Sequence, residues 1–386
     1  MNTFRENATL NLNPHEQIQL FSLEDADLPA PLLPAKPSFG RFSETGMAFE
    51  AAGRIASPSG AQLYLRHAPA EGDAKAVILI LHGLSEHAGR YRKFAEFLAA
   101  RGFAVYAHDQ RGHGRTMADD APIGRYAWRD GPEKLIKDVL AVRAHALSRH
   151  PGLPVILFGH SMGGIIAAYV AEHAPDAFDA LAVWNSHLYP GFTGRVGVAL
   201  LKGERFFKGS DVPSQIAPRL TFEAWAARIP GARTHFDWLS RDPAAVAAYL
   251  EDPLCAAPPS VSLWIDLLTM AGTAGRRAML ARLPKDLPVH LAGGSGDPST
   301  EDGEMLRRLA ANMARVGMRD VTLTIHEGMR HETLNEYGSD QAMEAFASWL
   351  DRVALRQGCN CRKTDEPLSQ AQPVGIITRH HPPHQA

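Results

Sequence analysis

Several features that define particular protein classes are scarce or missing in these 386 residues. There are only three cysteines, an odd number, so no disulfide framework is expected. No run of eighteen or more apolar residues occurs, so no transmembrane helix is expected either. A formal net charge of −2 gives no sign of nucleic-acid binding. The first 25 residues are polar and lack the apolar region of a secretory signal, which makes the cytoplasm the expected compartment.

What the chain does contain is an alternation of short apolar runs and longer helical segments. Two strands are expected at the start, one from Phe49 and one over Ala61–Arg66. The alternation then predicts strands Ala76–Leu81, Phe103–Ala107, Pro154–Phe158, Leu181–Trp184, Val289–Ala292 and Val321–Ile325, with helices Arg90–Ala100, Pro132–Arg149, Ile165–His173, Glu304–Val316 and Asp340–Leu355. Strands that alternate with helices form a parallel sheet covered on both faces. We therefore predict an α/β fold with a mostly parallel central sheet flanked by helices, built from residues 48–186 and 284–356.

The two ends of the chain have a different composition. Residues 1–47 are polar and contain several prolines, which predicts a flexible N-terminal extension. Residues 357–386 are polar as well and predict a disordered C-terminal tail. Cys359 and Cys361 lie there with three histidines, but their spacing fits no standard zinc pattern. We therefore expect neither a metal site nor a cofactor.

The stretch Gly159-His-Ser-Met-Gly163 lies between a predicted strand and a predicted helix. This G-x-S-x-G pattern in that setting is a nucleophile elbow, in which the serine occupies a sharp, strained turn. Gly159 and Gly163 allow the turn to close because they have no side chains. Ser161 would then lie above the sheet at a helix N-terminus, whose partial positive charge favours developing negative charge.

A serine nucleophile needs a base, and the base needs an acidic partner, which in this architecture follow in the order serine, acid, histidine. The strand Val289–Ala292 leads into a loop with Asp297, and the strand Val321–Ile325 into a loop with His331. Asp302 is the weaker candidate for the acid because it lies nearer the next helix. His326 continues its strand rather than reaching the loop. We predict a triad of Ser161, His331 and Asp297.

An oxyanion hole requires two backbone N–H donors. One donor is expected at Met162, directly after the nucleophile. The other is expected at Leu84, because Gly83 allows the loop after the strand Ala76–Leu81 to turn inward. His82 begins this loop and is expected beside the pocket, as a hydrogen-bonding brace rather than a catalyst.

Strand signals vanish between residues 187 and 283, where helical or irregular apolar segments appear instead. An insertion of this size after the strand that follows the nucleophile helix is predicted to be a largely helical cap over the active site; an extra packing subdomain without substrate contact remains the alternative. Its aromatic residues are candidates for the pocket lining: Phe206, Phe207, Phe222, Trp225 and Trp264. Lys202, Arg205 and Lys208 flank the first two. This pattern fits either a solvated helix face or a peripheral contact with an anionic membrane surface.

Five segments together carry a resemblance to a known family. They are His82-Gly-Leu-Ser-Glu-His-Ala-Gly-Arg-Tyr91, Asp109-Gln-Arg-Gly-His-Gly114, Gly159-His-Ser-Met-Gly-Gly164, Gly294-Ser-Gly-Asp-Pro298 and Arg330-His-Glu-Thr-Leu-Asn-Glu336. From about Phe49 to Leu355 the chain resembles the monoacylglycerol lipase and lysophospholipase branch of the α/β-hydrolase superfamily, which is similar to the S33 serine aminopeptidases. The resemblance implies the same triad, the same oxyanion donors and a lid that accepts single acyl chains. Thr333 stands where the family more often has an aliphatic residue.

The residues and the resemblance together predict a metal-independent serine esterase that acts on a small-molecule acyl ester. Single-chain esters such as a monoacylglycerol or a lysophospholipid are the expected substrates. Three alternatives stay open. A small-ester hydrolase would have a shallow acyl pocket, and an aminopeptidase would need fixed carboxylates in the cap, for which Glu204, Glu223 and Asp266 are available. A non-catalytic binding module would have no use for an intact triad. Neither the exact ester nor the oligomeric state follows from the sequence.

Overall fold

The computed structural model describes residues 49–360, and the expected mostly parallel sheet is confirmed. Eight strands lie in the order β1-β2-β4-β3-β5-β6-β7-β8. Only β1 and β2 pair in antiparallel fashion with their neighbours, whereas all pairs from β4 to β8 are parallel. The strands are β1 (Glu50–Ala56), β2 (Gln62–Ala68), β3 (Ala76–Leu81), β4 (Phe103–His108), β5 (Val155–His160), β6 (Ala180–Trp184), β7 (Val289–Gly294) and β8 (Val321–His326).

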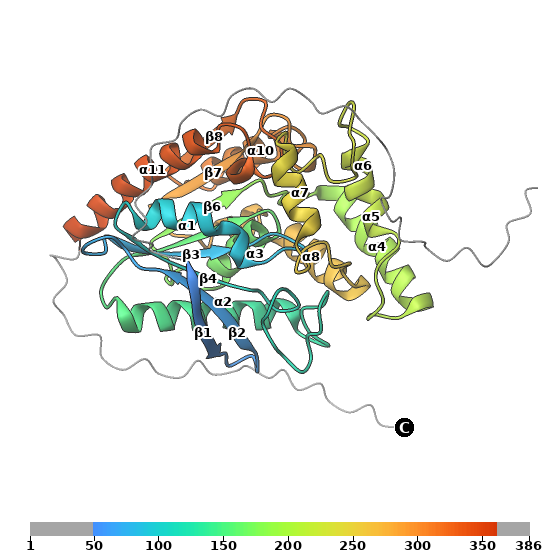
Figure 1. Ribbon diagram of the computed structural model, residues 1–386, viewed down its shortest axis with the longest axis horizontal. Helices are drawn as coiled ribbons and strands as arrows, with labels where there is room; N and C mark the ends of the chain where they lie inside the picture. The colour runs from blue at the N-terminus through green and yellow to red at the C-terminus, as the bar shows by residue number, and fades with distance from the viewer. Residues whose placement is uncertain (1–48, 361–386) are drawn as a thin grey trace, which may run out of the picture. The chain divides into compact units, whose positions relative to one another are not determined.

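Helices cover both faces of this sheet (Figure 1). The core elements are η1 (Ala88–Tyr91), α1 (Arg92–Ala99), α2 (Gly131–Arg149), α3 (Met162–His173), η2 (Pro298–Thr300), α10 (Glu304–Arg315), η3 (Thr333–Asn335) and α11 (Ser339–Asn360). Successive side chains of a strand point to opposite faces. In β3, Ile78 and Ile80 accordingly join the apolar cluster of α1 and α11, whereas Val77 and Leu79 join that of α2 and α3. The sheet is therefore buried on both sides, which explains why its central strands are unbroken apolar runs.

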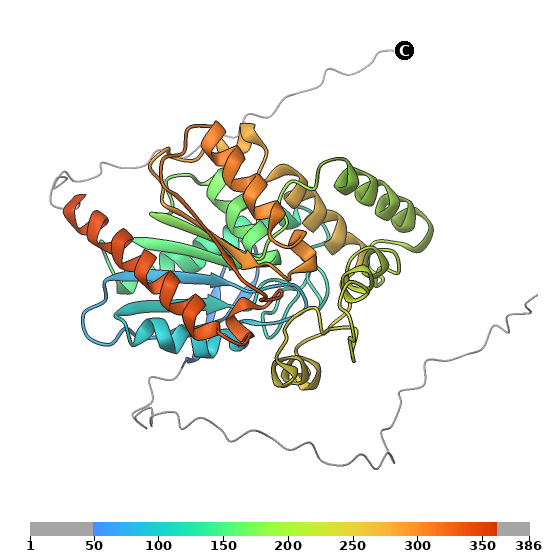
Figure 2. The ribbon, with the colours of Figure 1, turned by 90° about the horizontal axis from the view of Figure 1, so that it is seen from above.

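Six helices lie between β6 and β7, where the insertion was expected. They are α4 (Gly191–Lys208), α5 (Ala217–Leu220), α6 (Phe222–Ala226), α7 (Pro243–Glu251), α8 (Val261–Thr273) and α9 (Arg277–Leu280), and Figure 2 shows α4 to α8 toward one end of the sheet. Part of the insertion belongs to the core of the α/β domain rather than to a separate cap. Helix α8 packs against α3, and its buried face shares an apolar cluster with the sheet.

The ends of the elements differ from expectation by a few residues. Helix α11 runs to Asn360, so residues 357–360 are helical rather than part of the tail. The N-terminal extension and the tail from residue 361 lie outside the described residues, and so do Cys361 and the three terminal histidines. Within residues 49–360, no helix combines the length and hydropathy needed to cross a bilayer.

Candidate active site

Ser161 occupies the tight turn between β5 and α3. Its φ of 54° and ψ of −119° lie in a region that residues other than glycine rarely adopt, which is the strain expected of a nucleophile elbow. A Cβ on Gly159 would overlap the Gly163 carbonyl oxygen, and one on Gly163 would overlap that of Leu81. These glycines therefore permit the close approach of β5, α3 and β3 that places the Ser161 hydroxyl at the sheet edge.

The structure brings together the three residues predicted as a triad. His331 Nε2 lies 2.8 Å from Ser161 Oγ, and His331 Nδ1 lies 3.1 Å from each carboxylate oxygen of Asp297. Asp297 lies on the loop after β7 and caps η2, while His331 lies on the loop after β8. Ser161 follows β5, and the three loops meet because the carboxyl ends of parallel strands lie at one edge of a sheet.

The two residues judged weaker lie elsewhere. Asp302 is half-exposed and forms an ion pair of 2.6 Å with Arg228. His326 is the last residue of β8, and its ring faces Trp184. Neither is within hydrogen-bonding distance of Ser161 or His331 in the part of the chain that the structure describes.

Asp297 is fully buried and is held as a carboxylate by several donors. Burial opposes ionisation, but the facing His331 ring, the Ser299 hydroxyl and the Asn185 amide together lower the pKa of Asp297 to about 2. The Asn185 side chain donates to Oδ2 at 3.0 Å and accepts from the Thr333 hydroxyl at 3.0 Å. The sequence analysis did not identify Asn185 or Thr333 as site residues. Two features of the sequence could have identified them. Asn185 is a polar residue directly after a buried strand, and Thr333 lies two positions beyond His331.

The loop after β3 carries the expected oxyanion donor and is fixed by a buried carboxylate. Glu86 accepts from the Gly83 amide at 2.5 Å and from the Tyr91 hydroxyl at 2.7 Å. Leu84 and Met162 both line the cavity beside Ser161. Within residues 49–360 neither of their amides donates a hydrogen bond to the protein, so both N–H groups are free for a substrate oxygen.

His82 was expected at the substrate pocket, but it is not among the residues that line the cavity. Its ring is fully buried: Nε2 accepts from the Gln110 amide at 2.8 Å, and Nδ1 lies 2.8 Å from the Gly83 carbonyl oxygen. Burial lowers the pKa of His82 to about 4, so the ring is neutral and Nδ1–H donates to that carbonyl. It braces the oxyanion loop, which was the role preferred from sequence.

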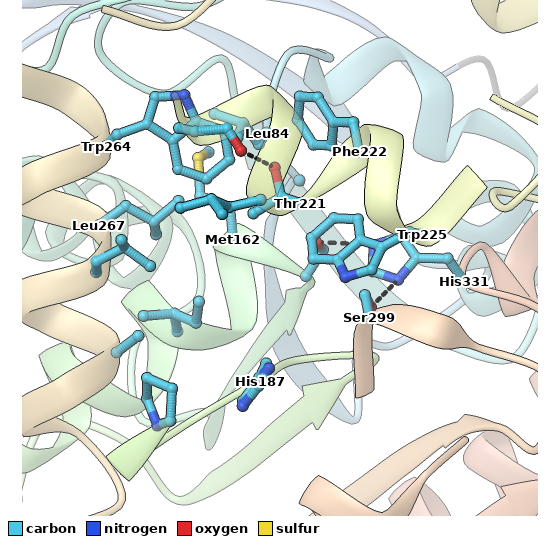
Figure 3. A pocket seen from close by; sticks show the side chains of 18 of the residues that line it. Leu84, Met162, His187, Thr221, Phe222, Trp225, Trp264, Leu267, Ser299 and His331 are labelled. Carbon is cyan, nitrogen blue, oxygen red and sulfur yellow. Dashed lines mark hydrogen bonds between the residues drawn. The ribbon is translucent and has the colours of Figure 1, made fainter. Parts of the chain in front are cut away.

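A cavity of about 550 Å³ opens above Ser161 (Figure 3). Three of the predicted aromatic residues, Phe222, Trp225 and Trp264, line it. Trp238 also lines the cavity and was not predicted from sequence; its ring centroid lies 4.8 Å from that of His331. Helices α4 and α8 contribute aliphatic side chains to the lining, among them Val196, Leu200, Leu267, Leu268 and Ala271, and α4 also contributes Gly197.

Phe206 and Phe207 were wrongly placed in this lining. Both are 84% exposed and lie near the C-terminal end of α4, outside the cavity. At 100° per residue they share the stripe of α4 that carries Phe192, Val196 and Leu200. The helix is longer than the cavity, however: at 1.5 Å per residue, Phe207 lies about 10 Å beyond Leu200 along the axis.

A buried ionic network joins the oxyanion loop to the histidine loop. Arg90 pairs with Glu86 at 2.7 Å and with Glu332 at 2.5 Å, and all three side chains are at most one-tenth exposed. Burial opposes the charge on Glu86, but the adjacent His160 ring and the charge on Arg90 hold its pKa well below the usual range. His160 in turn lies 3.0 Å from the His331 carbonyl oxygen through Nε2. The network fixes the position of His331 relative to the oxyanion loop.

One described cluster, His87, Asp252 and Cys255, has ligand atoms within 4.8 Å of one another. The Gly89 amide donates to His87 Nδ1, so the single proton of the neutral ring is on Nε2, directed at Asp252 Oδ2 at 2.8 Å. Burial raises the pKa of the Cys255 thiol to about 12. The cluster is therefore better described as a hydrogen bond between the oxyanion loop and the cap than as a set of ligands for an ion.

Comparison with known proteins is consistent with this geometry. The family model described as serine aminopeptidase S33 matches residues 72–338. A monoacylglycerol lipase of Mycolicibacterium smegmatis is 31% identical over 72% of this chain and 89% of its own length; for a monoglyceride lipase of Homo sapiens the values are 28%, 72% and 82%. The crystal structure of a thermostable carboxyl esterase from Bacillus coagulans superposes with a TM-score of 0.72 at 23% identity, over 80% of this chain and all of that one.

Proposed function

Since this chain belongs to the serine aminopeptidase S33 family of α/β-hydrolases and is a serine ester hydrolase of the monoacylglycerol lipase-like branch, we propose that it cleaves single-chain acyl esters, such as a monoacylglycerol or a lysophospholipid. The observation that carries the proposal is the hydrogen-bonded series Ser161–His331–Asp297 at the floor of a large, mainly apolar cavity.

The chemistry follows from the distances. Ser161 Oγ attacks the ester carbonyl while His331 Nε2 takes its proton, and Asp297 holds the Nδ1–H tautomer of the ring. The amides of Leu84 and Met162 bind the negative oxygen of the tetrahedral intermediate. When that intermediate collapses, His331 returns the proton to the departing alcohol. Water, activated by the same nitrogen, then releases the fatty acid from the acyl-enzyme.

The shape of the cavity supports a substrate with one long chain and a polar leaving group. Its α4 and α8 walls are aliphatic, which suits the acyl chain. Beside His331, the lining changes to the polar groups of Glu86, His160, Tyr249 and Glu332. Trp225 and Trp238 lie over the His331 ring and limit the access of water to it.

An aminopeptidase activity is the second candidate, because the family model carries that description. The acidic residues of the cap do not favour it. Glu204 accepts from the Ser214 hydroxyl and the Gln215 amide, and none of Glu204, Glu223 and Asp266 lines the cavity. Among the described residues, the carboxylates that do line it are Glu86 and Glu332, and both are paired with Arg90. A substrate ammonium would have to compete with that guanidinium.

The outer end of α4 supports a contact with a lipid surface. Phe206 and Phe207 project into solvent beside the exposed cations Lys202, Arg205 and Lys208. Exposed aromatic side chains flanked by basic ones are typical of peripheral helices that bind anionic membranes. A membrane contact at α4 would place the acyl pocket next to the phase in which long-chain esters dissolve.

A fluorophosphonate probe and a substrate panel test the function. Labelling of the wild type and its loss in Ser161→Ala are expected, whereas an unlabelled wild type would favour a non-catalytic binding module. The panel compares p-nitrophenyl acetate, monoacylglycerols, lysophospholipids and aminoacyl amides. Higher kcat/KM for the single-chain esters is expected; preference for the amides would support the aminopeptidase, and preference for acetate a small-ester hydrolase.

A further inference from the structure

Ser299 lies beside the proposed triad but has no place in the mechanism described so far. It belongs to η2, two residues after Asp297, and is 4% exposed. Its hydroxyl oxygen lies 2.8 Å from His331 Nδ1 and 2.7 Å from Asp297 Oδ1. Figure 3 shows the Ser299 side chain directed at the His331 ring. The hydroxyl is thus closer to Nδ1 than either oxygen of Asp297, at 3.1 Å.

The direction of these hydrogen bonds follows from the charge on Asp297. An ionised carboxylate only accepts hydrogen bonds, so the Ser299 O–H donates to Oδ1, as does the Ser299 amide at 2.9 Å. The lone pairs of the hydroxyl then face His331 Nδ1–H. Nδ1–H is therefore shared between the hydroxyl oxygen and the carboxylate.

We propose that Ser299 is a positioning residue that holds the His331 tautomer together with Asp297 and stabilises the positive charge that the ring gains during the reaction. The inference rests on the proposed function, since it requires His331 to act as the base. The negative end of the hydroxyl dipole faces the ring, and this orientation favours the imidazolium. Without the hydroxyl the ring would be harder to protonate.

Other titratable groups also face His331, and the test must leave them unchanged. The His160 ring centroid lies 5.1 Å away, and Glu86 lies within 3.7 Å of His160. Glu332 follows His331 in the chain and is paired with Arg90. His187 contacts the Ser299 backbone, and the cap contributes the uncharged rings of Trp225 and Trp238. Because no Ser299 side-chain hydrogen bond reaches these groups in the described chain, a side-chain substitution isolates the hydroxyl.

The experiment compares pH profiles of kcat and kcat/KM for Ser299→Ala, Ser299→Thr and Thr300→Val with the wild type. For Ser299→Ala we expect kcat to fall about tenfold with little change in KM, because a hydrogen bond to a charged group is lost. The acidic limb of its profile should move to lower pH. Ser299→Thr keeps a hydroxyl and should recover most of the rate. Thr300→Val is the matched control: its hydroxyl contacts only the backbone of this turn.

Three results would overturn the inference: an acidic limb of Ser299→Ala that coincides with the wild type, an equal shift in Thr300→Val, or a change confined to KM. Should Ser299→Ala not fold, Ser299→Cys is measured in the same way, because a thiol is a weak donor and acceptor. Failure of the proposed function is separate. It would appear as Ser161→Ala retaining wild-type activity, whereas an inactive Ser161→Ala with an unaltered Ser299→Ala contradicts only the role of Ser299.

Discussion

Two glycines of α4 allow the acyl-chain pocket to be tested with a matched pair of substitutions. Gly197 lines the cavity, and a Cβ built on it would lie 3.5 Å from Leu268 Cδ1, an ordinary contact. Gly203 lies on the same helix but outside the cavity, with nothing within 4 Å of an added Cβ. Gly197→Leu therefore fills part of the pocket, whereas Gly203→Leu does not. Both changes raise helix propensity by the same amount, roughly 1 kcal/mol.

The magnitude follows from the burial of methylene groups. Each CH₂ taken from water into the pocket contributes roughly 0.8 kcal/mol, or about fourfold in kcat/KM. A leucine at Gly197 that excludes two methylenes of a bound chain would therefore cost about 1.6 kcal/mol, or about fifteenfold. Acyl chains too short to reach Gly197 should be cleaved at the wild-type rate.

The assay is kcat/KM for p-nitrophenyl esters from acetate to decanoate, kept below aggregation. In the wild type and in Gly203→Leu, kcat/KM should rise by up to about fifteenfold for each two carbons until the pocket is full. In Gly197→Leu the rise should stop at a shorter chain. If the ratio of kcat/KM between the two variants is the same at every acyl-chain length, the assignment of the acyl pocket is refuted. If kcat/KM of the wild type does not change with chain length, the preference for long chains is refuted.

Three further outcomes are expected. Ser161→Ala and Asp297→Asn should fold normally and lose about 10⁴-fold in kcat, while Asp302→Asn stays near wild type; the reverse order of the two aspartates in steady-state kinetics would contradict the assigned acid. Replacing Phe206 and Phe207 by serine should weaken co-sedimentation with anionic vesicles without altering hydrolysis of p-nitrophenyl acetate, and unchanged sedimentation would exclude the membrane contact. Burial raises the pKa of Glu172 to about 8, although a hydrogen bond from the Gly275 amide opposes this shift. The folded wild type should therefore lose stability as the pH rises from the ordinary glutamate pKa to about 8. Glu172→Gln should thus unfold at a higher temperature than wild type at pH 9 and at a similar one at pH 4, as measured by calorimetry.

The parts of this structure that sequence could predict are those set by local constraints. The central strands are continuous apolar runs because both faces of the sheet are covered, so β3 was predicted to the residue. The turn at Ser161 excludes side chains at Gly159 and Gly163 by direct overlap, which makes the motif specific. Asp297 and His331 could be placed because each follows a recognisable strand.

The parts that sequence missed depend on contacts between distant segments. Ser299 and Asn185 are separated by 114 positions in the chain and meet only at the Asp297 carboxylate. Trp238 lies in an irregular stretch of the cap, where no sheet fixes which way a side chain points. The error over Phe206 and Phe207 has another cause: they were chosen because they are aromatic residues of the insertion, and residue type carries no information on where along α4 the cavity ends.

Backbone and side-chain hydrogen bonds join the cap to the core at two loops, the one with His331 and the one with Leu84. The Glu332 amide donates to the Leu239 carbonyl at 2.7 Å, beside His331. The Ser85 hydroxyl donates to the Ala257 carbonyl at 2.7 Å, next to Leu84. Moving this part of the cap would therefore disturb the positions of both His331 and Leu84. Helix α4 differs, because only Leu201 and Glu204 of its eighteen residues are buried. Elements with few buried side chains cost less to displace, so α4 is held less firmly than α8, in which seven of thirteen residues are buried.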